Sequence, residues 1–181
     1  MDVWRNEAMA TDLKTPAGFG AVFAAVDPDN LDFVSLRRIV SNLIPFGTHA
    51  GVQVTELGPD RAVVEIPDEQ HVLNHLSTVH AGALFLAADI AGACAFVGAA
   101  ASRLPAIGSL VLRDARITFR KPAVGRIRAT GTLDQRDIDA VLSARGEQRL
   151  EVDGRALLHD TAGVLVGKVQ LDYVCTLLET A

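Results

Sequence analysis

The feature that most constrains this chain of 181 residues is one long apolar segment, 79–101. Ten of its 23 residues are alanine, and His80 and Asp89 are its only ionisable side chains. A segment of this length can span a bilayer. However, alanine gives little driving force for insertion, and an Asp at the centre of a lone span costs at least ~2.5 kcal/mol. The segment therefore predicts a helix that is buried in a soluble protein and enclosed by a sheet.

Hydrophobic periodicity and turn residues place further elements on both sides of this helix. Apolar residues recur at helical spacing after the candidate caps Asp29 and Asn30. Beyond the long helix the apolar residues alternate, and we expect one face of the next strand to carry Val111, Ala115, Ile117 and Phe119. The expected order is a helix at 31–44, strands at 51–57 and 61–66, the long helix at 79–101, strands at 109–121 and 125–133, a short helix at 137–145, and strands at 149–159 and 164–178.

This order predicts an α+β fold in which an antiparallel sheet wraps around one long buried central helix, with an extra N-terminal helix. The small residues of the central helix allow the strands to approach it closely. The chain length favours a single core. We therefore divide the chain into an N-terminal extension at 1–30, partly flexible, and one domain at 31–181.

Charge and cysteine content narrow the class of protein. Seventeen basic and 22 acidic residues give a net charge of −5, which argues against a dedicated nucleic-acid binder. Cys94 and Cys175 lie far apart in apolar segments, where they are expected as small core residues rather than as a disulfide. The charged, partly acidic start of the chain, 1–14, differs from a signal peptide. We expect a cytoplasmic protein with no nucleic-acid or membrane partner.

Several kinds of catalytic site are absent from the sequence. It contains no G-x-S-x-G motif, no P-loop and no dinucleotide fingerprint. Cys94 has no nearby histidine that would activate its thiol. His71, His75 and His80 have a spacing compatible with zinc, but no second cluster completes a site, so solvated or hydrogen-bonded histidines are the favoured interpretation. We expect no metal and no cofactor.

One group of residues around the start of the long helix favours chemistry. Ser77 or Thr78 can cap the helix and leave the backbone N–H groups of Ala81 and Gly82 free to bind an oxyanion at its positive end. Asp89 follows about two turns later, on the helix face that also carries Phe85. A lone carboxylate in so apolar a helix is costly unless it is paired or used. Composition alone leaves a catalytic and a structural Asp89 equally open.

The segment 74–89 reads N-H-L-S-T-V-H-A-G-A-L-F-L-A-A-D and resembles the signature of hotdog-fold acyl-CoA thioesterases. It is most similar to the branch related to the phenylacetic-acid-pathway thioesterase. In that family an Asn precedes the His by six residues and an acidic residue follows it by nine, intervals that Asn74, His80 and Asp89 keep. The segment 116–123, R-I-T-F-R-K-P-A, resembles the family's strand ending in an aromatic, a basic residue and Pro-Ala. The resemblance spans roughly 46–178 and implies a hotdog fold.

The resemblance also implies roles for these residues. Asp89 would be the general base or nucleophile acting on a thioester, and Asn74 would position the water or the carbonyl. The backbone N–H groups of Ala81 and Gly82 would hold the thioester oxygen, with His80 orienting that turn. In this family the site lies at a dimer interface, which implies a homodimer or homotetramer whose subunits share Asn74 and Asp89.

Two departures from the family pattern separate this chain from its better characterised members. Ala81 replaces the first glycine of the usual His-Gly-Gly, and Leu112 stands where a Ser or Thr is often found. The sequence His-Ala-Gly-Ala is similar to a poorly characterised branch of the superfamily. The leading hypothesis is an acyl-CoA thioesterase. The alternatives are an acyl-CoA-binding protein without chemistry, or a hotdog hydratase or dehydratase, whose Pro-Gly-rich approach to the helix is missing here.

Basic residues concentrate after the long helix of this acidic protein. Two of them, Arg120 and Lys121, lie near a turn and would meet the phosphates of coenzyme A. From the residues alone, the favoured interpretation is that the whole group forms the solvated face of one pair of strands. The residues are Arg113, Arg116, Arg120, Lys121, Arg126 and Arg128.

Overall fold

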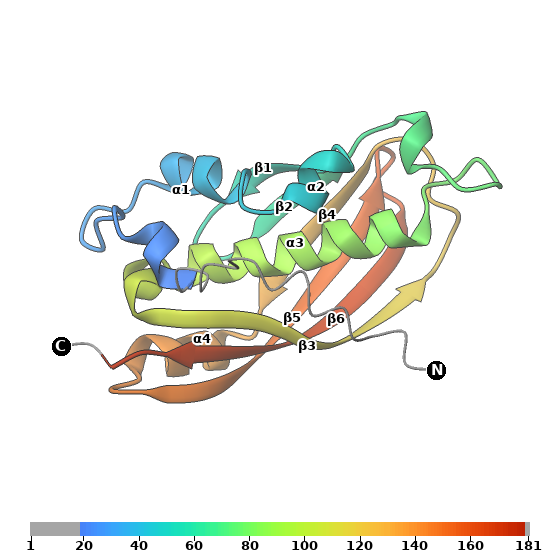
Figure 1. Cartoon of the computed structure of the whole chain (residues 1–181). Helices are drawn as coiled ribbons and strands as arrows, with labels where there is room; N and C mark the ends of the chain where they lie inside the picture. Colours follow the sequence, from blue (N-terminus) through green and yellow to red (C-terminus); the bar gives the residue numbers. More distant parts are fainter. Residues whose placement is uncertain (1–18, 180–181) are drawn as a thin grey trace, which may run out of the picture.

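The computed structural model describes residues 19–179. One six-stranded antiparallel sheet curves around the long helix α3 (Ala81–Ala99), with strand order β1-β2-β4-β5-β6-β3 (Figure 1). The strands are β1 (Gln53–Leu57), β2 (Ala62–Ile66), β3 (Ile107–Phe119), β4 (Ile127–Leu133), β5 (Gln148–Asp160) and β6 (Leu165–Leu177). The other helices are α1 (Phe33–Val40), α2 (Pro45–His49) and α4 (Gln135–Ser143), with 3₁₀ turns η2 (Phe19–Phe23), η3 (Gln70–Val72) and η4 (Ala101–Ala106).

The long apolar segment folds as predicted, because α3 is enclosed by the sheet and packs mainly on β2, β4 and β5. By length and composition α3 could cross a membrane, but most of it is buried within the fold. Small residues make the close approach of helix and sheet possible. A Cβ on Gly131 of β4 would overlap the backbone of Ala91, so only glycine allows this contact.

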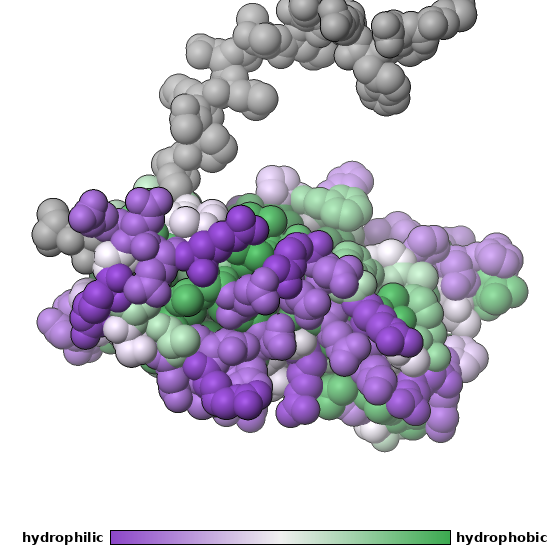
Figure 2. Space-filling view, turned by 90° about the horizontal axis from the view of Figure 1, so that it is seen from below, coloured by the Kyte–Doolittle hydropathy of each residue, from purple (hydrophilic) through white to green (hydrophobic). Residues whose placement is uncertain are grey.

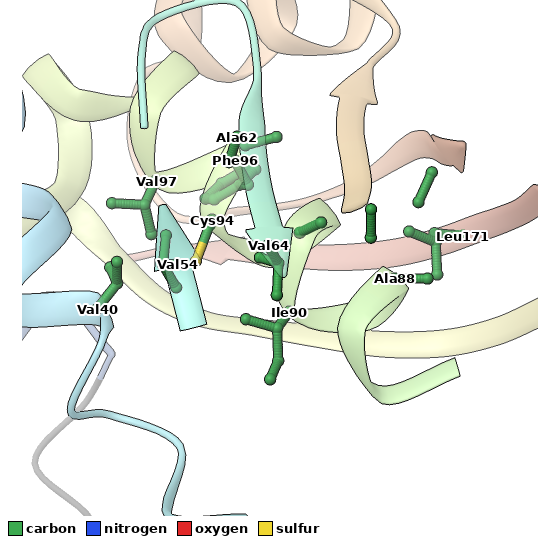
Figure 3. Packing of buried hydrophobic residues seen from close by; sticks show 14 of the residues in the cluster. Val40, Val54, Ala62, Val64, Ala88, Ile90, Cys94, Phe96, Val97 and Leu171 are labelled. Carbon is green, nitrogen blue, oxygen red and sulfur yellow. The ribbon is translucent and has the colours of Figure 1, made fainter. Parts of the chain in front are cut away.

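The core is built from branched aliphatic and small side chains, as the composition predicts. Figure 3 shows α3 residues such as Ile90, Cys94 and Val97 in one cluster with Val54 and Val64 of the sheet. Cys94 and Cys175 are both free and buried, which confirms their prediction as core residues. Burial raises the pKa of the Cys94 thiol to about 12 and that of Cys175 to about 11. Neither thiol is therefore ionised near neutral pH.

The predicted apolar face of β3 needs one correction. The β3–β6 register shifts between Leu112 and Asp114, leaving a β-bulge at Arg113. Leu112, rather than Val111, therefore joins Ala115 on the face that points towards α3. Val111 lies on the outer face and is 56% exposed. Strict alternation predicted the opposite because a sequence pattern does not reveal a bulge.

The predicted N-terminal helix at 31–44 is divided in two. Asp32 caps α1 by accepting the Val34 N–H at 2.9 Å, so Asp29 and Asn30 are not the caps. The helix ends at Val40, where Ser41 turns its hydroxyl back to the Arg37 carbonyl. Pro45 then begins α2, because proline is favoured in a first helical turn but cannot continue a preceding helix.

The segment before α1 packs on the domain where the structure describes it. Phe23 of η2 is fully buried, and the Phe19 ring meets the Phe96 ring of α3 edge-on at 6.5 Å. The described part of the predicted extension at 1–30 therefore contributes to the core. The prediction that the extension at 1–30 is partly flexible also covers residues 1–18, which lie outside the described residues.

Candidate active site

The start of α3 is capped by His80 rather than by Ser77 or Thr78, which corrects the prediction. His80 has extended backbone angles, and its Nδ1 accepts the Gly82 N–H at 2.9 Å. Accepting this bond requires Nδ1 to be unprotonated, so the proton of the neutral ring lies on Nε2. Ser77 instead adopts a positive φ of 58° within a tight turn. The His80 ring is thereby held against the first turn of the helix.

Asn74 holds together the loop that leads into α3. Its Oδ1 accepts the backbone N–H groups of Leu76 at 2.8 Å and Thr78 at 3.3 Å, and its Nδ2 donates to the Thr78 hydroxyl at 2.9 Å. An amide nitrogen carries two protons, so a second Nδ2 proton is left for a ligand. The half-buried Asn74 side chain is therefore a rigid donor beside the helix start.

The two backbone donors predicted for an oxyanion are not equivalent. The Gly82 N–H is occupied by His80, whereas the Ala81 N–H meets no acceptor within residues 19–179. The first-turn N–H groups of a helix carry its positive partial charge. The prediction that Gly82 is free was wrong because His80, and not an earlier residue, caps the helix. Ala81 is the available donor.

Asp89 lies two turns further along α3 and is half-buried. Burial raises the pKa of its carboxyl, and the nearby Tyr173 hydroxyl partly offsets this rise. Tyr173, which is 2% exposed on β6, donates its hydroxyl to the Asp89 backbone carbonyl at 3.1 Å. Gly92 makes room for this hydroxyl, because a Cβ at that position would overlap it. No cationic side chain among residues 19–179 forms an ion pair with Asp89.

A hollow of about 420 Å³ lies between the loop before α3, the first turn of α3 and the end of β3. Four of the predicted site residues, Asn74, Ala81, Arg120 and Lys121, line this hollow. Phe85 and Asp89 do not line it. Phe85 is 36% exposed and shares with Asp89 the one stripe of α3 that the sheet leaves open. The structure thus places the proposed oxyanion donor Ala81 and the basic residues around one hollow. The Asp89 carboxylate lies outside that hollow.

The predicted cluster of basic residues on one strand pair is wrong, because β3 and β4 are not neighbours in the sheet. Three of the six residues pair with acidic side chains. Arg113 pairs with Glu151, Arg126 with Glu65, and Arg128 with Glu56 and Glu65. Arg120 and Lys121 form no ion pair within residues 19–179, which distinguishes them from the paired residues.

The remaining candidates lie as follows. Leu112 is half-buried on the inner face of β3 and brings no hydroxyl to the site. His71 bonds the Ala50 carbonyl through Nε2 at 3.2 Å and lies 3.3 Å from Glu69, away from His80. In the described part of the chain, no three His, Cys, Asp or Glu side chains are placed to hold a metal ion. The histidines at 71 and 80 therefore have separate local partners.

Sequence reasoning missed Tyr173. The chain contains a single tyrosine, which sits at an alternating position of a predicted strand. This pattern indicates an inward-facing side chain but not which helix residue lies above it. Only the register of β6 under α3 reveals the contact with Asp89.

Solved structures with this arrangement define the class of fold. The chain matches a probable thioesterase from Pseudomonas aeruginosa with a TM-score of 0.64, at 23% identity over 80% of this chain and 95% of that one. It matches a thioesterase from Haemophilus influenzae with a TM-score of 0.62, at 15% identity over 82% and 93% of the two chains. A mutant of the phenylacetic acid degradation protein PaaI from Thermus thermophilus matches with a TM-score of 0.56, at 25% identity over 72% and 98%. The chain has the hotdog fold.

Within this fold class, the family follows from the sequence itself. Residues 34–174 match the family model described as "Domain of unknown function (DUF4442)". The match covers well over half of the chain, and the chain belongs to this family. Among curated proteins, no relative matches it.

Proposed function

We propose that this protein is a thioesterase that hydrolyses an acyl-CoA or a related acyl thioester. The observation that carries the proposal is the hollow at the positive end of α3. It is lined by the Ala81 N–H, the Asn74 amide and the cationic Arg120 and Lys121, and among residues 19–179 the Ala81 N–H has no acceptor and the two cations have no ion pair. These groups suit a carbonyl oxygen that becomes negative and a leaving group that carries phosphates. The similarity to structures named as thioesterases supports the same reaction class.

The proposed reaction assigns one task to each group. The Ala81 N–H and the helix dipole stabilise the oxygen of the thioester carbonyl as it becomes an oxyanion. Asn74 orients the carbonyl or the water through its remaining Nδ2 proton. Asp89, ionised, takes a proton from water, whose oxygen bonds to the carbonyl carbon. The carbon–sulfur bond then breaks, and the departing thiolate receives the proton. In the alternative route the Asp89 carboxylate attacks the carbon itself, and the carbon–sulfur bond breaks as the thiolate leaves. Water then hydrolyses the resulting mixed anhydride, which returns Asp89 as a carboxylate and provides the proton that the thiolate takes up.

The separation of these groups implies that two copies complete the site. Ala81 and Asp89 are eight residues apart on one helix, which is roughly 12 Å at 1.5 Å per residue. A carbonyl carbon bound at Ala81 is therefore out of reach of Asp89 in the same chain. We propose a homodimer as the smallest unit, with Asp89 from one copy facing Asn74 and Ala81 of the other.

The edge strand β3 is the proposed contact between the two copies. Among residues 19–179 β3 ends the sheet, so one row of its backbone N–H and C=O groups has no neighbouring strand there. Its inner face is only partly covered by α3, and Phe119 at its end is 51% exposed. Figure 2, which looks at the molecule from below, shows hydrophobic surface among hydrophilic residues on this side. Pairing of β3 with a second β3 would bury this edge and bring the two sites together.

A second candidate function is an acyl-CoA-binding protein without turnover. It is favoured by Leu112, which brings no hydroxyl, and by the occupied Gly82 N–H, which removes one oxyanion donor. The two functions are separated by incubating the purified protein with a panel of acyl-CoA esters and a thiol reagent. Release of free thiol that is lost in Asp89→Asn supports the thioesterase. Saturable binding without thiol release would support the binding protein instead.

A further inference from the structure

The hydroxyl of Thr78 lies at the start of α3 and has no task in the reaction proposed above. The sequence suggested Thr78 as a helix cap, but His80 takes that position. Among the described residues that line the hollow, Thr78 alone has a hydroxyl group, and no carboxylate lines the hollow with it. Its oxygen accepts an Asn74 Nδ2 proton at 2.9 Å, and its own proton has no acceptor within residues 19–179. The Thr78 hydroxyl is therefore an open donor beside the hollow.

The loop holds this hydroxyl in a fixed place. Asn74 and Thr78 bond reciprocally, because the Asn74 N–H donates to the Thr78 carbonyl at 2.8 Å and the Thr78 N–H donates to the Asn74 Oδ1 at 3.3 Å. The next residue, Val79, is buried, and its N–H donates to the Ala123 carbonyl at 2.8 Å. A β-branched side chain such as threonine also has few rotamers. The half-buried Thr78 hydroxyl is thus pre-organised, which is what a donor to a transition state requires.

Two other groups that would serve as donors do not supply one in this chain. His80 occupies the Gly82 N–H, and Leu112 brings no hydroxyl from β3. The first turn of α3 is left with the Ala81 N–H, although an oxyanion is stabilised by backbone and side-chain donors acting together. The Asn74 amide donates to the Thr78 oxygen, and such a chain of hydrogen bonds makes the Thr78 hydroxyl a stronger donor in its turn.

We propose that the Thr78 hydroxyl is a catalytic donor that bonds the carbonyl oxygen of the substrate together with the Ala81 N–H. This inference rests on the thioesterase function proposed above. As the carbonyl oxygen becomes negative, the hydrogen bond from Thr78 strengthens, while the proton stays on the Thr78 oxygen. The alternative is that Thr78 acts only through Asn74, by holding its amide in place. The two roles have different consequences once Asn74 is changed.

The first test is the turnover of variants that differ in the hydroxyl. Thr78→Val keeps the shape of the side chain and removes the donor, so kcat should fall by ~10²–10³-fold. Thr78→Ser keeps the hydroxyl and should retain most of the activity. Thr48→Val, the same change on an exposed residue of α2 outside the hollow, should leave kcat unchanged. Circular dichroism melting confirms that each variant is folded, and wild-type turnover in folded Thr78→Val would overturn the proposal.

A double-mutant cycle with Asn74→Ala separates a donor from a residue that only positions Asn74. If the Thr78 hydroxyl contacts the carbonyl itself, Thr78→Val should lower kcat further in the Asn74→Ala background. If Thr78 acts only by holding Asn74, the second change should cost no more activity once the amide is gone. That second result would overturn the proposal.

The infrared band of a bound carbonyl tests the same contact without turnover. The probe is the dethia analogue of the acyl-CoA in the panel that binds most tightly, in which a methylene group replaces the sulfur and prevents hydrolysis. Hydrogen bonds lower the stretching frequency of a carbonyl, so the band of the bound analogue should lie at higher frequency in Thr78→Val than in the wild type, Thr78→Ser or Thr48→Val.

This readout separates the failure of the Thr78 role from the failure of the proposed function. A protein that hydrolyses no ester but shows the frequency difference would contradict the thioesterase and still support the contact between Thr78 and the carbonyl. A protein that hydrolyses esters but shows the same band in the wild type and in Thr78→Val would keep its function, and the role of Thr78 would be overturned.

Discussion

The two halves of α3 have nearly the same composition but different surroundings. In the second half, Ile90–Ala99, most residues are buried between the sheet and the N-terminal segments. In the first half, Ala81–Asp89, a stripe with Phe85 and Asp89 stays partly open, and its start borders the hollow. Both halves are rich in alanine and glycine. Small residues in one helix therefore allow close packing at its second half and leave its first half accessible.

One glycine from each half of α3 illustrates this difference in surroundings. A Cβ at Gly98 would overlap the backbone carbonyl of Gly58, which cannot move aside cheaply. A Cβ at Gly82 would approach only the His80 ring, at 3.1 Å from Nδ1. Composition is therefore a poor guide to which glycine the fold requires, whereas the neighbouring atoms decide it.

The largest expected effect comes from changing Asp89, the one carboxylate of the open half. Asp89→Asn keeps the shape and removes the proton acceptor, so kcat should fall by ~10²–10⁴-fold. Burial raises the pKa of Asp89, so its ionised form costs free energy in the folded state near neutral pH. The thermal midpoint of the Asn variant should therefore stay the same or rise.

A structural Asp89 predicts the reverse result. The midpoint would then fall, and activity would be lost only in proportion to unfolded protein. Measuring kcat and the midpoint on one preparation separates the two roles. A folded Asn variant with wild-type turnover would remove Asp89 from the mechanism.

The second-largest effect is expected in the enclosed second half of α3, Ile90–Ala99. Gly98→Ala should destabilise the fold by about 1–3 kcal/mol or more, because the new methyl group meets backbone with no space to relax. Gly82→Ala is the matched control in the open half, where alanine favours the helix and the expected change is within about 1 kcal/mol. Urea denaturation of both variants measures the difference. Equal stabilities would show that the two halves are not packed as differently as described.

A smaller effect is expected at Tyr173, which connects the enclosed core to the open half. Tyr173→Phe removes the hydroxyl that bonds the Asp89 carbonyl, a loss of about 0.5–1.5 kcal/mol of stability. The hydroxyl also lowers the pKa of Asp89, so its removal should raise that pKa further. The acidic limb of the rate profile should then move to higher pH with kcat at the plateau little changed. If the acidic limb does not move, Tyr173 contributes packing and does not affect the pKa of Asp89.

The smallest effect is expected at the rim of the hollow. Changing both Arg120 and Lys121 to Ala should raise KM for an acyl-CoA several-fold, since exposed ion pairs are individually weak. The same acyl group on a short thiol without phosphates should be little affected. Arg126→Ala with Arg128→Ala, residues that already pair with Glu65 and Glu56, serves as the control. Equal effects on both substrates would mean that the two residues do not contact phosphates.

The sequence predicted the long helix, the succession of strands along the chain and the buried cysteines, because hydrophobic period and length are local signals. It did not predict the bulge at Arg113 or the position of β4 away from β3, because strand register depends on pairing across the sheet. The same limit applies to the site. Asn74, Ala81, Arg120 and Lys121 line one hollow, but the cap at His80 and the contact of Tyr173 with Asp89 depend on atomic geometry that spacing does not encode.

The proposed hydrolysis depends on an ionised Asp89 in the open half of α3. The most direct test is the pH dependence of kcat/KM for an acyl-CoA ester. Activity requires the carboxylate, so it should fall as the pH decreases through the pKa of Asp89, which burial places above the ordinary value for aspartate. We predict a single acidic limb above the ordinary aspartate range, absent from the residual activity of Asp89→Asn. A limb that persists in that variant, or a wild-type profile that is flat across this range, would contradict the account.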